Sequence, residues 1–368
     1  MDLSDPEFAH ITDPLVREML ERTLKPAPET KPYWATANGE ARLYKGDALE
    51  LLGRLKPESF ELIFADPPYF LSGGGMTCQS GKRVSVNKGA WDVPSTLEEM
   101  HAFNMTWLSL CQRALTPNGS LWVSGTQHNI FSVGYALQTL GFKVLNDIAW
   151  YKVNPPPNLS CRYFTHATET VLWARKDQSA RHTFDYETMK AANGGKQMQS
   201  LWSIKPPATW EKRYGKHPTQ KPEALLLRII EASSRLGERV LDPFCGSATT
   251  GVAALRLGRI FIGFDQEDNY LDHAQKRLRD EAQQPSLLFV IPVVDFEPFV
   301  STPVIAWAEV VVAALESLGG EADLRTITRQ VGRSPRTRSC PTWPATVRRI
   351  VRQSKRFEVV GRARYRLR

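Results

Sequence analysis

Apolar and polar residues alternate along most of the chain in blocks whose spacing predicts strands followed by helices. Residues 41–55 predict a strand, a turn and a short helix. Apolar runs predict further strands within residues 60–69, 116–125, 143–152, 168–176, 239–241 and 261–265. Apolar positions three and four apart predict helices over residues 95–115, 129–142 and 252–258. This alternation favours an α/β fold, with a mostly parallel sheet covered by helices on both faces.

The last fifth of the chain has a different pattern. Helical spacing recurs in residues 303–319, 321–332 and 342–354, and two short strands are predicted around Gly361. Three helices and a hairpin predict a small winged helix-turn-helix-like domain, for which a dimerisation module is the alternative. At 368 residues the chain is long enough for more than one domain. We expect an N-terminal extension (1–39), a main domain (40–286), a linker (287–300) and the C-terminal domain (301–368).

Charge separates the two predicted domains. Residues 301–368 hold 14 Lys and Arg against 5 Asp and Glu, a net of +9, whereas the chain as a whole carries +8. The excess of positive charge therefore lies in the C-terminal domain, where it favours contact with a polyanion over a merely solvated tail. The predicted third helix would present Arg348, Arg349 and Arg352 to a DNA groove.

Cysteine usage and the N-terminus point to a reducing compartment. Five cysteines are scattered without CxxC spacing, which argues against a disulfide framework and against a zinc site. No apolar run reaches membrane-spanning length, and the N-terminus lacks the features of a signal peptide. We expect a cytoplasmic protein that needs no metal and contacts no membrane.

The strand within residues 60–69 ends in Asp66-Pro67-Pro68-Tyr69. Proline fixes the direction of the chain and places a carbonyl without adding a competing N–H group. A carboxylate, a rigid carbonyl and an aromatic ring are therefore held together at the end of a strand. A simple β-turn with proline at the corner would account for this tetrapeptide taken alone.

A second motif, Asp242 to Gly251 (DPFCGSATTG), joins an apolar strand to a helix. Its small residues allow a ligand to approach the backbone, and Asp265 ends the next strand, where a carboxylate can hold two ribose hydroxyls. A dinucleotide-dependent dehydrogenase is the competing interpretation. However, the loop is not GxGxxG, and no second mononucleotide-binding half follows it.

Together with His217-Pro-Thr-Gln-Lys-Pro, these motifs give the chain a resemblance to the β-class DNA adenine-N6 amino-methyltransferases of the cell-cycle and restriction–modification types. The resemblance covers about residues 40–280, and the order of motifs is the same: catalytic motif, recognition region, cofactor loop. It implies a Rossmann-like class I methyltransferase sheet and the cofactor S-adenosyl-L-methionine. One departure is Ala248, where the family more often has a further glycine.

The resemblance implies a role for each candidate site residue. The catalytic candidates are Asp66, Pro67, Pro68 and Tyr69. The candidate cofactor contacts are Asp47, Ala48, Asp66, Thr219, Gln220, Lys221, Asp242, Phe244, Cys245, Gly246, Ser247, Thr249, Thr250 and Asp265. Among them Asp47 would touch the adenine of the cofactor, with a simple helix N-cap as its alternative role, and residues 219–221 would touch the methionine end.

The amino-group chemistry is consistent with the first motif. Asp66 and the carbonyl of Pro67 would accept the two hydrogens of an exocyclic amino group, and Tyr69 would stack on a base flipped out of double-stranded DNA. Adenine N6 is the expected target and cytosine N4 the alternative. A DNA-binding regulator with a relic methylase fold and an RNA methyltransferase are further alternatives.

Two segments are expected to contact DNA besides the C-terminal domain. Residues 71–91 form a glycine-rich, basic segment (with Lys82, Arg83 and Lys88) that would cover the DNA as a flexible loop, or be only a surface loop. The irregular residues 187–216 are the expected target-recognition region. A cognate restriction endonuclease and a second copy of the chain are candidate partners, and a bacterial nucleoid is the expected location.

Overall fold

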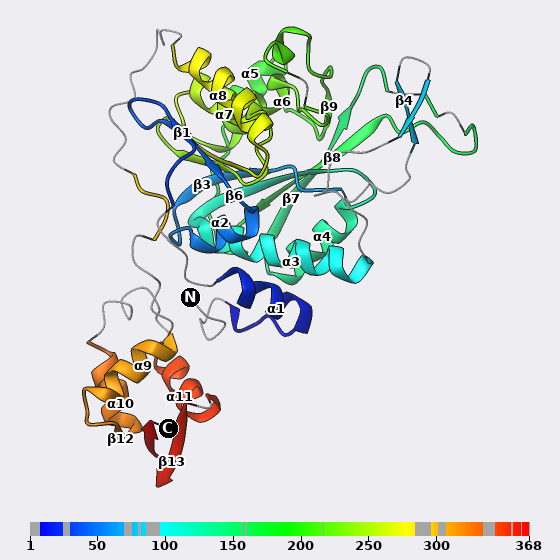
Figure 1. Cartoon of the computed structure of the whole chain (residues 1–368). Helices are drawn as coiled ribbons and strands as arrows, with labels where there is room; N and C mark the ends of the chain where they lie inside the picture. Colours follow the sequence, from blue (N-terminus) through cyan, green and yellow to red (C-terminus); the bar gives the residue numbers. More distant parts are fainter. Residues whose placement is uncertain are drawn as a thin grey trace. The chain divides into compact units, whose positions relative to one another are not determined.

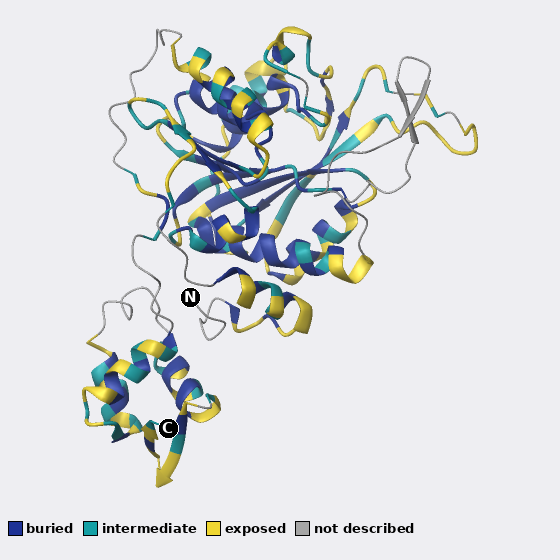
Figure 2. Ribbon diagram, viewed as in Figure 1, coloured by how far each residue is buried: buried dark blue, intermediate teal, exposed yellow. Residues whose placement is uncertain are grey.

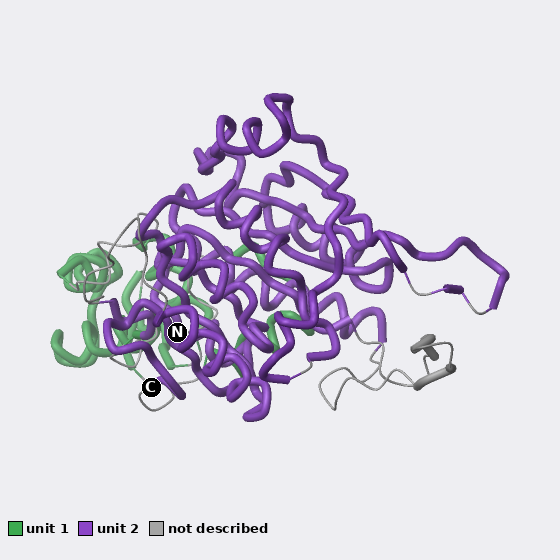
Figure 3. Tube along the Cα trace, turned by 90° about the horizontal axis from the view of Figure 1, so that it is seen from above, with its two compact units in different colours: residues 1–29, 300–368 green, residues 30–299 purple. Residues whose placement is uncertain are grey.

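The computed structural model describes two compact units. One contains residues 1–29 and 300–368, and the other contains residues 30–299 (Figure 3). The described residues are 8–24, 30–69, 76–79, 82–85, 96–155, 157–158, 160–215, 217–283, 296–300, 307–333, 343–354, 356–361 and 363–367. Most of the predicted loop 71–91 and of the predicted linker 287–300 lies outside these ranges, as does Lys88.

A nine-stranded sheet in the order β1-β2-β11-β10-β3-β6-β8-β7-β9 forms the centre of residues 30–299, as far as they are described. Its strands are β1 (Trp34–Ala35), β2 (Ala41–Lys45), β3 (Phe60–Ala65), β6 (Leu115–Gly125), β7 (Lys143–Tyr151), β8 (Thr168–Arg175), β9 (Leu201–Ser203), β10 (Arg239–Asp242) and β11 (Ile260–Asp265). Strands β2, β11, β10, β3 and β6 run parallel to one another, whereas β1 pairs antiparallel with β2, and β8 runs antiparallel to both β6 and β7. The carboxyl ends of β2, β3, β6, β7, β10 and β11 therefore meet at one edge, which we call the carboxyl edge.

Helices cover both faces of this sheet (Figure 1). One layer contains α2 (Ala48–Arg54), α3 (Leu97–Ala114) and α4 (Ile130–Thr139); the other contains α5 (Tyr186–Ala192), α6 (Glu223–Ser233), α7 (Thr249–Arg256) and α8 (Asp268–Ala282). The central strands β3, β10 and β11 are mostly buried (Figure 2), which is why their sequences are near-continuous apolar runs. The α/β prediction, with helices on both faces, is confirmed.

Local sequence explains where α3 begins. The Thr96 side chain accepts a hydrogen bond from the backbone N–H of Glu99, and the Glu99 carboxylate accepts one from the backbone N–H of Thr96. This reciprocal capping box satisfies two N–H groups at the helix start that have no partner within the helix.

Tryptophans fill the core beside strands β6, β8 and β9. The rings of Trp122 and Trp173 stack with centroids 4.7 Å apart, and Trp202 on β9 packs beside Trp122. Trp202 is thus a core residue, whereas Trp210, in a short 3₁₀ helix (Trp210–Lys212), is 58% exposed.

The C-terminal part of the other unit has its own apolar core. It consists of α9 (Trp307–Glu316), β12 (Glu321–Asp323), α10 (Leu324–Val331), α11 (Trp343–Gln353), β13 (Phe357–Gly361) and β14 (Arg364–Leu367). The three strands pair antiparallel in the order β12-β14-β13. Strand β12 occupies the start of the segment predicted as a second helix, because Asp323 caps a helix that begins only at Leu324. The N-terminal residues of this unit contain α1 (Pro14–Thr23).

A two-stranded hairpin, β4 (Met76–Gln79) with β5 (Lys82–Ser85), follows the Asp66-Pro67-Pro68-Tyr69 motif in the sequence. In the part of the chain that the structure describes, no helix is both long and apolar enough to cross a membrane.

Candidate active site

A cavity of about 260 Å³ opens at the carboxyl edge of the sheet. Its walls come from the ends of β2, β3, β10 and β11, from α3 and from the segment before α6. The lining residues are Gly46, Asp47, Ala48, Asp66, Pro68, Phe103, His217, Thr219, Pro243, Phe244, Phe264, Asp265, Gln266, Glu267 and Tyr270. Segments distant in the sequence meet here because parallel strands place their carboxyl ends side by side.

Four carboxylates, those of Asp47, Asp66, Asp265 and Glu267, line this cavity. Asp265 accepts hydrogen bonds from the backbone N–H of Gly246 at 3.0 Å and of Glu267 at 2.8 Å. Burial outweighs these bonds and raises the pKa of Asp265 to about 6. Asp265 is therefore still mostly ionised at neutral pH and able to accept further hydrogen bonds from a ligand.

Asp47 serves two purposes at once. Its side chain accepts hydrogen bonds from the backbone N–H groups of Leu49 and Glu50, so it is the N-cap of α2. It also lines the cavity and accepts a hydrogen bond from the Gln266 side chain at 2.9 Å. The helix-cap role and a ligand role are compatible.

The turn that begins α7 can be formed only with small residues. Gly246 has φ of +51°, and a Cβ atom at this position would lie 2.9 Å from the His217 ring. Ala248 has φ of +55°, the left-handed conformation that glycine adopts most easily. This geometry gives a physical reason for the glycine that the family more often has at the position of Ala248.

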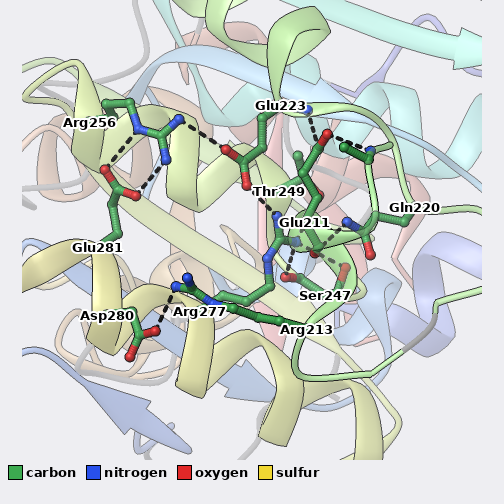
Figure 4. Close-up of polar contacts among 11 residues, drawn as sticks. Glu211, Arg213, Gln220, Glu223, Ser247, Thr249, Arg256, Arg277, Asp280 and Glu281 are labelled. Carbon is green, nitrogen blue, oxygen red and sulfur yellow. Dashed lines mark hydrogen bonds and ion pairs between the residues drawn. The ribbon is translucent and has the colours of Figure 1, made fainter. Parts of the chain in front are cut away.

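Arg277 of α8 holds this turn through hydrogen bonds and an ion pair (Figure 4). Its guanidinium donates to the carbonyl of Ser247 at 2.8 Å, to the Ser247 hydroxyl at 3.2 Å and to the Thr249 hydroxyl at 2.9 Å. It also pairs with Glu223 at 2.9 Å, and Glu223 in turn pairs with Arg256. Ser247 and Thr249 therefore contact a buried ion-pair network and do not line the cavity.

Asp242 also acts inside the turn. It accepts hydrogen bonds from the Thr250 hydroxyl at 2.5 Å and from the backbone N–H of Phe244 at 3.0 Å. Burial raises the pKa of Asp242 to about 7. The carboxyl group thus joins the end of β10 to the first turn of α7, and the side chain that reaches the cavity is that of Phe244.

Asp66, Tyr69 and Lys221 form a closed triangle of hydrogen bonds beside the cavity. The Tyr69 hydroxyl donates to Asp66 Oδ1 at 2.5 Å, and Lys221 Nζ donates to Asp66 Oδ2 at 2.5 Å and to the Tyr69 oxygen at 3.1 Å. Glu169 on β8 lies 3.7 Å from Lys221 Nζ. Burial alone would lower the pKa of Lys221, but the charges of Asp66 and Glu169 outweigh it and raise that pKa. Lys221 is therefore charged, and it fixes both the carboxylate and the ring.

Some of the predicted site residues line the cavity and others do not. Asp47, Ala48, Asp66, Pro68, Thr219, Phe244 and Asp265 line it. The other predicted residues do not line it: Pro67, Tyr69, Gln220, Lys221, Asp242, Cys245, Gly246, Ser247, Thr249 and Thr250. Gln220 is buried, and its side chain donates to the carbonyl of Glu211. The residues that line the cavity without having been predicted to are Gly46, Phe103, His217, Pro243, Phe264, Gln266, Glu267 and Tyr270.

The predicted DNA-contacting residues are spread over three parts of the chain. Lys82 and Arg83 belong to β5, and Lys88 lies outside the described residues. In α11 the side chains of Arg348 and Arg352 are exposed, and Arg349 is half-buried. The buried residues of this helix, Thr346, Val347, Ile350 and Val351, lie on the other side.

Comparison with known proteins gives matches over most of the larger unit. Residues 60–276 match the family described as DNA methylase. The chain is 57% identical over 254 residues to the Type II methyltransferase M2.LlaDCHI of Lactococcus lactis subsp. cremoris, which covers 69% of this chain and 94% of that protein. It is 56% identical over 253 residues to the Type II methyltransferase M2.DpnII of Streptococcus pneumoniae, covering 68% and 94%.

A solved structure supports the fold assignment. The PvuII DNA methyltransferase, described as cytosine-N4-specific, superposes with a TM-score of 0.53 at 23% identity, over 69% of this chain and 94% of that chain. At this level of identity the likeness concerns the fold.

Proposed function

We propose that this chain, which belongs to the DNA methylase family, methylates the N6 amino group of adenine in a specific double-stranded DNA sequence. It is a DNA methyltransferase that uses S-adenosyl-L-methionine. The observation that carries the proposal is the position of Asp66. This carboxylate lines the cavity and is held in place by Tyr69 and Lys221.

The cavity residues fit the cofactor. Four carboxylates around one cavity favour a ligand that carries a positive sulfonium and an amino group. Asp265 ends the strand after the glycine-containing turn, where it would hold the ribose hydroxyls, and the tight backbone at Gly246 leaves the space that a Cβ would fill. Asp47 would hold the adenine end and Thr219 the methionine end.

The bound cofactor supplies an electrophilic methyl group, and the chain's own residues prepare the nucleophile. An exocyclic amino group is a poor nucleophile because its lone pair is delocalised into the ring. Asp66 and the Pro67 carbonyl would accept both amino hydrogens and so favour a pyramidal nitrogen with an available lone pair. The nitrogen becomes positively charged as the new bond forms, and the carboxylate stabilises that charge.

Adenine is favoured over cytosine by the first residue of the motif. Asp66 is the first residue of its tetrapeptide, and cytosine-N4 enzymes frequently have serine at that position. The similarity through residues 128–176 is to adenine enzymes. The test is to incubate the purified protein with duplex DNA and labelled S-adenosyl-L-methionine, and to separate the nucleosides of the digested product. N6-methyladenine is the expected product, and N4-methylcytosine alone would contradict the proposal.

The C-terminal residues 301–368 are proposed as a winged helix-turn-helix-like second contact with DNA. Three helices, a hairpin, a net charge of +9 and the exposed Arg348 and Arg352 on α11 support this role. Within the larger unit, residues 187–216 are proposed to recognise the target sequence. We further propose that the enzyme acts on chromosomal DNA in the bacterial cytoplasm, alongside a cognate restriction endonuclease, and that two copies of the chain can associate.

A further inference from the structure

The chain between β7 and β8, residues 152–167, extends outward from the sheet (Figure 1). We call it the arm. Strands β6 and β7 both run antiparallel to β8, so β7 ends at the same carboxyl edge as β6 and β3. The arm therefore leaves the sheet at the edge that carries Asp66.

The two ends of the arm, where it joins β7 and β8, are its roots. The root at β7 is linked through ion pairs to the hydrogen-bonded triangle of Asp66, Tyr69 and Lys221. Lys152, the first residue of the arm, pairs with Glu169, and Glu169 lies 3.7 Å from Lys221 Nζ. Lys221 in turn contacts Asp66 at 2.5 Å. Near the other root, the His166 ring lies 3.3 Å from the side chain of Gln127, just after β6. A substrate held at Asp66 would therefore lie next to the root of the arm.

The second half of the arm presents aromatic side chains to solvent. Phe164 is 96% exposed and Tyr163 is 63% exposed. The turn that carries them is braced, because the Asn158 side chain donates to the Tyr163 carbonyl at 2.6 Å and accepts from the Ser160 N–H at 3.0 Å. Cys161 adopts φ of +53°, a strained conformation for this residue type. Backbone strain of this kind is concentrated at active sites and ligand-contacting segments, and the exposed Tyr163 and Phe164 follow this strained residue closely in the sequence.

We propose that Phe164 inserts into the DNA duplex at the target and fills the space that the flipped adenine leaves. The inference rests on the proposed function and extends it to the duplex itself. Apolar side chains inserted between base steps are a known means of holding distorted DNA. DNA is the occupant that the arm fits, because residues 152–167 contain no Asp or Glu and the exposed Arg162 places a positive charge two residues from Phe164. Phe164 is four residues from Thr168, so it lies within about 14 Å of the start of β8.

The test compares one variant on two DNA substrates. Phe164→Ala in the full-length protein should lower kcat/KM on a fully paired duplex by roughly 5- to 150-fold, the range expected for one lost stacking contact. On the same duplex with the target adenine opposite cytosine, the loss should be within about threefold, because a mismatched base is flipped at little cost. Phe164→Trp should restore the paired activity. The fluorescence of 2-aminopurine placed at the target, which rises on flipping, should change in parallel.

Leu236→Ala is the matched control. Leu236 is 58% exposed and lies just before β10, at the opposite edge of the sheet, so its loss should leave both substrates unaffected. Equal losses of Phe164→Ala on both substrates, or unchanged activity on the paired duplex, would overturn the inference. A wild-type enzyme that methylates single strands but not duplexes would overturn it as well. If the wild-type protein forms no N6-methyladenine on any of these substrates, the proposed function fails instead.

Discussion

Replacing Lys221 with methionine should slow methyl transfer and leave cofactor affinity nearly unchanged. Lys221 Nζ contacts Asp66 at 2.5 Å and the Tyr69 hydroxyl at 3.1 Å, and it does not line the cavity. The side chain of Lys221 is only 7% exposed, and that of Asp66 only 13%. The structure therefore places this lysine on Asp66, the proposed acceptor of the target amino group. The sequence resemblance had implied the methionine end of the cofactor.

The size of the effect follows from the burial of the pair. Two opposite charges 2.5 Å apart attract by about 7 kcal/mol at an effective dielectric constant of 20, and desolvation offsets much of this attraction. Removing one partner of a buried pair costs about 3–5 kcal/mol. Asp66 keeps the Tyr69 bond and some solvent contact, so the lower end, about 3 kcal/mol, applies. If this whole stabilisation of about 3 kcal/mol is missing from the transition state, the rate of methyl transfer falls by about 150-fold.

The assay distinguishes two roles for Lys221, support of Asp66 and contact with the methionine end of the cofactor. Single-turnover methylation at saturating cofactor should slow by about 150-fold, while calorimetry should give a dissociation constant for S-adenosyl-L-methionine within about threefold of the wild-type value, which is under 1 kcal/mol. Lys152→Met is the matched control: this lysine also pairs with Glu169 but has no bond to Asp66. Its variant should lose far less activity than Lys221→Met.

Two further results complete this test. Lys221→Arg, which keeps the charge and the hydrogen-bond donors, should recover part of the rate. The reasoning would be refuted if Lys221→Met bound the cofactor more than about tenfold more weakly, or 1.4 kcal/mol, and methylated at the normal rate once saturated. That outcome would place Lys221 at the methionine end of the cofactor.

Other residues give further predictions. Asp66→Ala should abolish methyl transfer but retain calorimetric binding of the cofactor; near-normal turnover would contradict its role. Because burial raises the pKa of Asp265 to about 6, cofactor affinity should fall as the pH drops through 6 and the acceptor is protonated, and Asp265→Asn should remove that step. Arg277→Met should lower Tm by about 6–20 °C and weaken cofactor binding by loosening the turn before α7; an unchanged Tm in calorimetry would contradict this. Replacing Arg348 and Arg352 with alanine should reduce the slope of log affinity for DNA against log salt by about 1–2, and an unchanged slope would exclude phosphate contacts from α11.

The sequence predicts the edge of the sheet on which the site lies. Asp66 and Asp265 each end a buried apolar run, and parallel strands bring such ends together whatever the loops between them do. The prediction of an S-adenosyl-L-methionine-dependent DNA methyltransferase is confirmed. The choice of adenine stays a prediction, because the chemistry of the two amino groups is alike.

The cavity residues that the sequence missed had weaker signals. Gln266 and Glu267 simply follow Asp265, so their place in the wall could have been found from the strand end. Phe103 of α3 and His217 before α6 reach the cavity through packing between elements, which periodicity does not report. Lys221 and Asp66 are 155 residues apart, and their contact depends on how the segment before α6 packs beside the end of β3.

The side of a loop on which a short side chain lies is decided by residues elsewhere in the chain. Ser247 and Thr249 belong to the turn with the small residues that a cofactor needs, so the sequence suggests that both touch the ligand. In the structure both bind Arg277 instead. A signal for this existed: Leu271, Ala274 and Leu278 mark the buried face of α8, and Arg277 falls within that face. A guanidinium there must find buried acceptors, because burying it unpaired would cost several kcal/mol. The hydroxyls of the turn and the carboxylate of Glu223 supply those acceptors, so the geometry of the turn depends on α8 as much as on its own glycine.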